Sequence, residues 1–182
     1  MTAPTTKTAT NRASRLFFDR QLRWVLVAVV AVAAALWRTL PEAPAGELSG
    51  PADVRDGDSI NIRSARIRLE GIDAPELGQS CGRPDAAWDC GRAAATHLAR
   101  LIAGRRVTCA WRRRDRHGRY LARCTAGSDD LNALMVRNGM AVGFGGNYAR
   151  EENAARAAGH GLWAGPFLRP DVWRRRHPRG DH

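Results

Sequence analysis

The stretch from residue 54 to residue 76 constrains the fold more than any other part of the chain. It alternates apolar and polar residues like two half-buried strands, with a Gly-containing turn at its start. Asp58 stands near one end of the stretch, Asp73 and Glu76 stand at the other, and Arg68 lies between them. Three carboxylates and an arginine at adjoining strand ends suit a hard cation and a phosphate group. The stretch therefore predicts β-structure and a chemical site built on its strand ends.

The rest of the domain interleaves helices with short strands, after a polar loop over residues 81–89. Apolar spacing and Gly stops predict helices over 91–103, 130–138 and 148–160, a hairpin of strands over 107–111 and 120–125, and a short strand over 141–144. Short strands followed by interleaved helices indicate an α+β domain.

The charge of the chain indicates an anionic partner. The formal net charge is +11, and residues 1–50 contribute only +3 of it, from six basic and three acidic residues. The remaining +8 belongs to residues 51–182, the part that is expected to fold. A basic domain of this kind is typical of proteins that bind nucleic acid.

The N-terminal segment favours a membrane anchor. Residues 1–22 predict a disordered basic tail, and an apolar run of 14 residues follows from Trp24 to Trp37. A transmembrane helix needs about 20 apolar residues to cross the bilayer. The run approaches this length if it extends to residue 40 and the Arg38 side chain reaches back to the membrane interface. Terminal tryptophans and the preceding positive charge predict a transmembrane anchor over residues 23–40, with its N-terminus in the cytoplasm.

A cleavable signal peptide is the alternative, because Ala43-Pro44-Ala45 offers small residues just before Gly46. The long leading segment and Arg38 argue against cleavage, and the lack of a polar face argues against a buried amphipathic helix. Both leading interpretations place the domain outside the cytoplasm, as a single-pass protein of the cell membrane or as a secreted or periplasmic protein. Residues 41–50, rich in Pro, Gly and Ser, predict a linker.

Export affects the interpretation of the four cysteines, because disulfides persist outside the cytoplasm. If the hairpin is symmetric about residues 116 and 117, Cys109 lies directly opposite Cys124, at about 4.5–5.5 Å between Cα atoms, within reach of a disulfide. Cys81 and Cys90 would then close a short loop. A zinc site is the alternative, but the spacings contain no CxxC pair and no suitably interleaved His. The predicted disulfides are Cys81–Cys90 and Cys109–Cys124, as structural staples.

Three separated motifs resemble those of one known family. They are Asp-Gly-Asp-Ser at 56–59, Arg-Leu-Glu-Gly-Ile-Asp-Ala-Pro-Glu at 68–76 and Asp-Arg-His-Gly-Arg at 115–119. The residues of these motifs and the order of the motifs along the chain resemble those of the staphylococcal nuclease (thermonuclease) family, over about residues 54–167. The resemblance implies a five-stranded OB-fold-like β-barrel with three helices, here over residues 51–168. It also implies an endonuclease that depends on Ca²⁺ and cuts DNA and RNA with little sequence preference.

The resemblance assigns metal and base roles to four matched positions. Asp58 and Asp73 would bind Ca²⁺ with the backbone carbonyl of Ala74, which stands where the family has Thr. Because that ligand is a carbonyl, loss of the hydroxyl is expected to be tolerated. Glu76 would activate the attacking water as a general base.

The same resemblance assigns the phosphate contacts. Arg68 and Arg119 would neutralise the charge that develops on the phosphoryl group. Arg116 and His117 replace a Lys and a Tyr of the family and would contact substrate, and Tyr148 is a candidate for stacking on a base.

A non-catalytic nucleic-acid-binding barrel at the cell surface is the alternative function. A binding protein that had lost catalysis is expected to lack an acidic ligand or a clamp arginine. This chain retains five such side chains, which are Asp58, Arg68, Asp73, Glu76 and Arg119. No Gly-rich phosphate loop with Lys is present, since Lys7 is the only lysine, and HExxH and Gly-x-Ser-x-Gly motifs are absent too. No protein partner is implied, and residues 169–182 predict a disordered basic tail.

Overall fold

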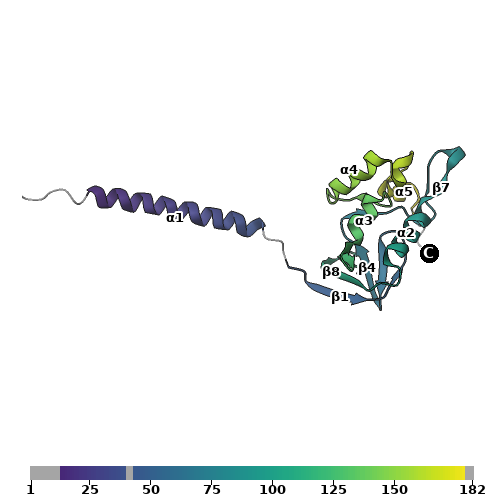
Figure 1. The fold of residues 1–182 in the computed structure, drawn as a ribbon, viewed down its shortest axis with the longest axis horizontal. Coiled ribbons are helices and arrows are strands. Elements are labelled where there is room, and N and C mark those ends of the chain that lie inside the picture. The colour runs from purple at the N-terminus through teal and green to yellow at the C-terminus, as the bar shows by residue number, and fades with distance from the viewer. Residues whose placement is uncertain (1–12, 40–42, 179–182) are drawn as a thin grey trace, which may run out of the picture. The chain divides into compact units, whose positions relative to one another are not determined.

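The structure, a computed structural model, describes residues 13–39 and 43–178 and divides into two units, Met1–Glu42 and Ala43–His182. In the first unit, α1 (Ala13–Thr39) is one continuous helix, so residues 13–22 of the predicted disordered tail are helical (Figure 1). Within the described ranges, no helix is long and apolar enough to cross a membrane. The transmembrane anchor predicted over residues 23–40 is therefore not found, and the uninterrupted apolar run has 14 residues where a span needs about 20. The predictions for residues 1–12, 40–42 and 179–182 lie outside the described residues.

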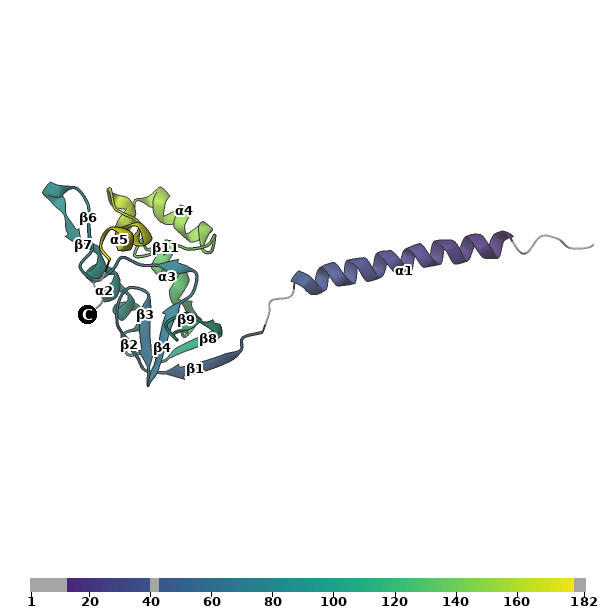
Figure 2. The same ribbon diagram turned by 180° about the vertical axis from the view of Figure 1, so that it is seen from behind.

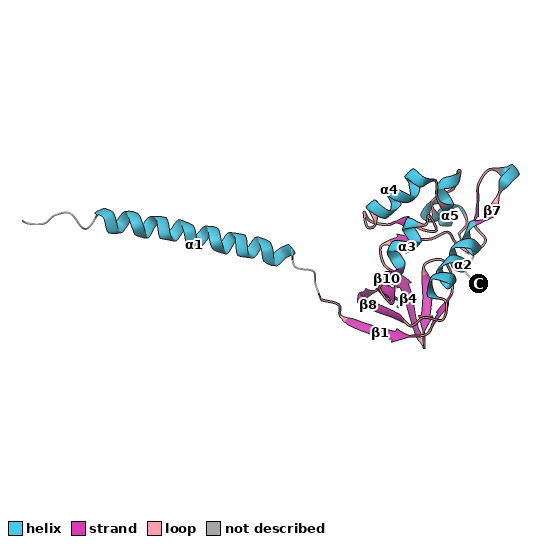
Figure 3. Cartoon of the chain, viewed as in Figure 1, coloured by secondary structure: helices cyan, strands magenta, loops and turns pink. Residues whose placement is uncertain are grey.

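The second unit is an α+β domain built on a sheet that curls into a half-barrel (Figures 1 and 3). Its strands follow the order β1 (Gly46–Gly50), β8 (Val107–Arg114), β9 (Tyr120–Ala126), β4 (Ala65–Leu69), β3 (Ser59–Ile62) and β2 (Ala52–Val54), with β10 (Asp129–Asp130) paired to β9. All pairs are antiparallel except β4 with β9, which is parallel. The described sheet thus has seven strands where the resemblance implied five.

The period-two pattern in β3 and β4 divides their side chains between two faces of the sheet. Ile60, Ile62, Ile67 and Leu69 are fully buried in the main core. Because successive side chains alternate across a strand, Arg68 points to the opposite face from its two buried neighbours. Burial of one face therefore fixes which way the arginine points.

Two helices cover the open side of the curled sheet. α2 (Cys90–Ile102) begins where the Asp89 carboxylate accepts the backbone N–H of Arg92 at 2.8 Å, and Ala94, Leu98 and Ile102 face the core. α3 (Leu131–Arg137) begins in the same way, with its N-terminus capped by the Asp130 carboxylate. Both helices lie where apolar spacing predicted them.

The remaining elements are two short strand pairs, two 3-10 helices and two further helices. They are the strand pair β5 (Ile72–Asp73) and β11 (Val142–Gly143), the pair β6 (Ser80–Cys81) and β7 (Trp88–Asp89), the 3-10 helices η1 (Pro84–Ala86) and η2 (Gly161–Ala164), α4 (Ala149–Ala158) and α5 (Pro170–Arg176). Seen from behind, α5 lies on the same side of the sheet as α2 and α4 (Figure 2).

Both predicted disulfides are present. Cys109 and Cys124 are directly opposed in the β8–β9 register, and the Cys81–Cys90 disulfide joins the end of β6 to the start of α2. Cys81 and Cys90 also belong to a second small core that includes Leu162, Trp163 and Phe167.

Two segments differ from their prediction. The segment predicted as a linker over residues 41–50 contains β1, which pairs along its whole length with β8. The segment predicted as a disordered tail over residues 169–182 contains α5. A domain drawn as residues 51–168 would therefore omit one edge strand and one helix.

Candidate active site

Strand register gathers the candidate residues at one end of the sheet. Ser59 on β3 lies opposite Arg68 on β4, and Arg68 lies opposite Leu121 on β9. Arg119 precedes Leu121 by two residues, so it extends from the same face of the sheet. Segments that are about fifty residues apart in the sequence thus meet side by side.

Asp58 is held in a tight, buried turn at the start of β3. Its backbone N–H donates to the Asp56 carboxylate at 3.0 Å, and a Cβ at Gly57 would lie only 2.6 Å from the Cβ of Ala74. Only Gly therefore lets this turn pack against the β5 end. Asp58 is 4% exposed, and burial raises its pKa to about 7, although Arg68 acts in the opposite direction. A carboxylate buried to this degree needs a neighbouring positive charge.

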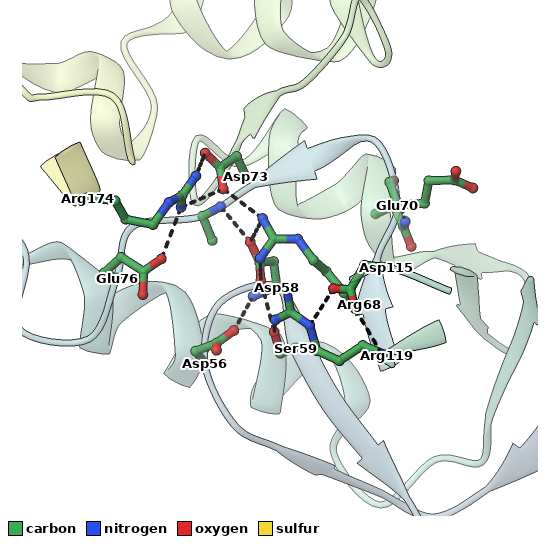
Figure 4. Close-up of polar contacts among 12 residues, drawn as sticks. Asp56, Asp58, Ser59, Arg68, Glu70, Asp73, Glu76, Asp115, Arg119 and Arg174 are labelled. Atoms are coloured by element: carbon green, nitrogen blue, oxygen red, sulfur yellow. Dashed lines mark hydrogen bonds and ion pairs between the residues drawn. The ribbon is translucent and has the colours of Figure 1, made fainter. Parts of the chain in front are cut away.

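Arg68 supplies such a charge to two carboxylates at once (Figure 4). Its Nη1 donates to Asp58 Oδ1 at 3.1 Å, and its Nη2 lies 3.0 Å from Asp58 Oδ2 and 2.8 Å from Asp73 Oδ1. Asp73 is 2% exposed and sits on β5, which pairs with β11. The backbone N–H of Ala74 donates to Asp58 Oδ2 at 3.1 Å, so the two acidic segments are also joined directly.

Arg119 reaches the same place from the hairpin. Its Nη1 is 3.4 Å from Ser59 Oγ, which in turn donates to Asp58 Oδ1 at 3.0 Å. Asp115 fixes it in place, because the carboxylate accepts Arg119 Nε at 2.8 Å and the Arg119 backbone N–H at 3.0 Å. Desolvation opposes ionisation of Asp115, but the hydrogen bonds from Arg119 and from the His117 backbone outweigh it and lower its pKa. The sequence contained Asp115 in a motif, but its positioning contact becomes visible only in the fold.

Glu76 lies in the loop after β5, packed against the first turn of α2. Its backbone N–H donates to Gln79 Oε1 at 3.2 Å, and its carboxylate accepts Arg174 Nη1 at 3.0 Å. A Cβ at Gly91 would lie 1.9 Å from the Glu76 carbonyl oxygen. The close approach of helix and loop therefore sets the position of the Glu76 backbone.

We expect Gly91→Ala to lower the free energy of unfolding by about 1–3 kcal/mol, because the added methyl forces the Glu76 loop or the helix to move. Denaturant unfolding measures this change. Gly165→Ala is the matched control, since its Cβ would meet only the Gly82 Cα at 3.8 Å, and it should stay within about 0.5 kcal/mol. Equal stability of the two variants would contradict the tight packing.

Arg174, on α5, is the functional candidate that sequence reasoning missed. Its Nη1 donates to Asp73 Oδ1 at 2.9 Å and its Nη2 donates to Asp73 Oδ2 at 2.9 Å, in addition to the bond with Glu76. The hydrogen bonds to Asp73 raise the pKa of Arg174. Its sequence signal was a Pro170-Asp171 start followed by three arginines, which suits a short helix but also a basic tail.

An open cavity of about 760 Å³ lies over these groups. The cavity is rich in arginine and is lined by Asp56, Arg66, Arg68, Glu76, Arg113, Arg114, Asp115, Arg116, His117, Arg119, Leu121 and Arg174. Arg116 and His117, predicted to bind substrate, lie at the exposed hairpin tip with Arg116 Nε 3.1 Å from His117 Nε2.

Tyr148 does not line the cavity. Its ring packs beside Gly71 and against the main core, with the Arg123 guanidinium 5.7 Å from the ring centroid, and burial raises its pKa. It caps the start of α4 in the left-handed conformation, at φ 56°. Tyr148 therefore packs as part of the fold, and its predicted role in stacking on a base stays a prediction.

The residues present partly fit a hard cation. Asp58 and Asp73 offer carboxylate oxygens, the type that Ca²⁺ prefers, and their buried charge is compensated by guanidinium groups. No group of three or more His, Cys, Asp or Glu in the described part of the chain is arranged to hold a metal ion. Further oxygen ligands would have to come from backbone carbonyls such as that of Ala74, or from water.

A cavity lined by many arginines and by the carboxylates of Asp56, Glu76 and Asp115 suits an enzyme that acts on phosphodiesters. Comparison with known proteins identifies the particular family. The family model described as staphylococcal nuclease homologue matches residues 66–165, and the chain belongs to that family. The protein is a nuclease, and the family predicted from three motifs is confirmed.

Individual relatives agree with this assignment. The chain is 37% identical over 140 residues to the succinoglycan biosynthesis protein ExoI of Rhizobium meliloti (strain 1021), covering 73% of each chain. It is 36% identical over 136 residues to an uncharacterized endonuclease of Escherichia coli O157:H7, covering 68% of this chain and 82% of the relative. It is also 36% identical over 124 residues to the probable staphylococcal-like nuclease CAN2 of Oryza sativa subsp. japonica, covering 65% of this chain and 31% of the relative.

Proposed function

We propose that the protein is a Ca²⁺-dependent endonuclease that hydrolyses DNA and RNA with little sequence preference. The observation that carries the proposal is the convergence of two arginines on one buried carboxylate. Arg68 contacts Asp58 directly, and Arg119 reaches it through Ser59. A phosphate placed between the two guanidinium groups would lie beside the acidic pair, where a cation could neutralise it further.

Asp58 and Asp73, with the carbonyl of Ala74, are the proposed holders of Ca²⁺. When bound, the cation supplies a Lewis acid that polarises the phosphoryl oxygens. The paired carboxylates are both buried, so their charge is concentrated at one place and partly shielded from water. These carboxylate oxygens are of the type that a hard divalent cation binds.

Glu76 is the proposed general base, and it lines the same cavity as both arginines. It would take a proton from a water molecule as the water oxygen forms a bond to phosphorus. The bond from phosphorus to the 5′-oxygen then breaks, and that oxygen takes a proton from solvent water, so the products are a 3′-phosphate and a 5′-hydroxyl. Arg68 and Arg119 would donate to the non-bridging oxygens as their negative charge increases.

The walls of the cavity suit the sugar–phosphate backbone. Arg66, Arg113, Arg114 and Arg116 line it with charged forks that bind phosphate and do not distinguish bases. Contacts of this kind support binding of both DNA and RNA with little sequence preference. His117 at the hairpin tip would add a contact to a neighbouring phosphate.

We also propose that the domain acts outside the cytoplasm. The support is its pair of disulfides, which account for all four cysteines and would not persist in a reducing compartment.

Digestion of single-stranded DNA by the full, oxidised chain tests the proposal. We expect cleavage with Ca²⁺ to fall at least about a hundredfold in chelator and to return when Ca²⁺ is restored, because the cation contributes several kcal/mol to transition-state stabilisation. The ends should be 3′-phosphates. Undiminished cleavage in chelator would contradict the metal requirement. Tight, salt-sensitive binding without cleavage would favour the non-catalytic barrel instead.

A further inference from the structure

Arg174 fills the space between the proposed cation ligand and the proposed base. Its guanidinium contacts both oxygens of Asp73 and one oxygen of Glu76, each at 2.9–3.0 Å (Figure 4). The Arg174 side chain is 38% exposed, whereas those of Asp73 and Glu76 are 2% and 15% exposed. The arginine thus closes the solvent side of two carboxylates that are otherwise enclosed.

The approach to α5 is anchored to the loop that carries Glu76. Gln79, which is fully buried, accepts the Glu76 backbone N–H and donates its Nε2 to the Leu168 carbonyl at 2.7 Å. A second bond lies two residues earlier in the chain, where the Gly82 N–H donates to the Pro166 carbonyl at 2.9 Å. These bonds fix the chain at the start of α5, so the helix delivers Arg174 to a defined position rather than as part of a loose tail.

Asp73 cannot serve a divalent cation and Arg174 in the same way at the same time. Its Oδ1 already accepts Arg68 and Arg174, and its Oδ2 accepts Arg174. A cation bound to these oxygens would meet the guanidinium charge at a few ångströms, where repulsion between like charges in a partly buried site is strong. Binding of one therefore weakens binding of the other.

We propose that Arg174 is a built-in competitor of the divalent cation, holding Asp73 and Glu76 until the cation displaces it. The inference rests on the proposed function, because it takes Asp73 as a cation ligand. Without cation, the same contact keeps Glu76 occupied by an arginine. Through Arg174, α5 thereby makes release of the Glu76 carboxylate dependent on the concentration of the cation.

Calorimetric titration of the full, oxidised chain with CaCl₂ tests the inference. Arg174→Gln should bind Ca²⁺ at least about tenfold more tightly than the unmodified chain, within the range typical of two coupled ligands. Arg174→Lys, which keeps the charge but loses the two-point fork, should fall between them. Thermal unfolding in chelator checks that each variant is folded.

Arg175→Gln is the matched control. It removes the same charge from the same helix, but Arg175 pairs with the exposed Asp171 at 2.9 Å and does not line the cavity. Its Ca²⁺ affinity should stay within about twofold of the unmodified chain, since exposed ion pairs contribute little. Equal or weaker affinity in Arg174→Gln would overturn the competition while leaving the nuclease proposal intact. Absence of Ca²⁺ binding in every variant would overturn both.

Discussion

Glu76→Gln is expected to lower kcat on single-stranded DNA by about 10²–10⁴-fold, the usual contribution of general acid–base catalysis. The substitution preserves the size of the side chain and an oxygen that can still accept from Arg174, but the amide cannot take a proton from water. Steady-state kinetics at saturating Ca²⁺ measures the effect. Binding of the DNA should change little, because the loss falls on the chemical step.

Glu70→Gln is the matched control for this prediction. Glu70 undergoes the same change of charge, but its carboxylate pairs with Arg113 at 3.2 Å and it does not line the cavity. Its kcat should remain within about twofold of the unmodified value, as for most surface substitutions. Similar losses of kcat in both variants would mean that Glu76 acts only through its negative charge and not as a base.

Arg119→Ala should lower kcat by about 10²–10³-fold, as removal of one donor to a developing charge commonly does. The effect should appear in kcat and kcat/KM alike, because the contact strengthens as the phosphoryl group gains negative charge. Arg119→Lys should recover part of the loss by restoring the charge without the fork. Steady-state kinetics with Ca²⁺ measures kcat and KM for the unmodified chain and for both variants.

The free energy of unfolding of Arg119→Ala shows whether its lower kcat comes from lost catalysis or from unfolding. The Asp115–Arg119 pair is partly exposed, so its removal should cost no more than about 1 kcal/mol of unfolding free energy. Arg83→Ala provides the control for lost charge, because Arg83 pairs with Asp85 in the exposed β6–β7 hairpin. Near-normal turnover in Arg119→Ala would remove this arginine from the mechanism.

The parts of the fold that local chemistry dictates could be predicted from the sequence. Alternation in β3 and β4 determined which side chains are buried, and apolar spacing with Gly stops placed α2 and α3 to within a few residues. Symmetry of the hairpin placed Cys109 opposite Cys124, as observed. Each of these predictions depended on residues that lie close together in the sequence.

The features that were missed depend on distant partners. β1 has no strong apolar alternation and becomes a strand because it covers the edge of β8. α5 has seven residues, too few to be stable alone, and is positioned by the bond from Gln79 to Leu168, which are 89 residues apart. The left-handed backbone and core packing of Tyr148 are likewise tertiary properties, and its predicted contact with a base stays a prediction. Propensity and spacing contain no information on such contacts.

The Cys109–Cys124 crosslink has a consequence for how the tip of the β8–β9 hairpin can vary. A one-residue slip between paired strands would turn every following side chain to the opposite face, and Arg119 would then leave the cavity. A covalent bond between directly opposed residues prevents that slip, and the irregularity between Trp111 and Arg113 lies beyond it, towards the tip. We therefore expect residues 116 and 117 to tolerate exchange while Arg119, the proposed catalytic arginine, keeps its alignment. The crosslink thus fixes the pairing of the hairpin strands without depending on which side chains stand at the tip.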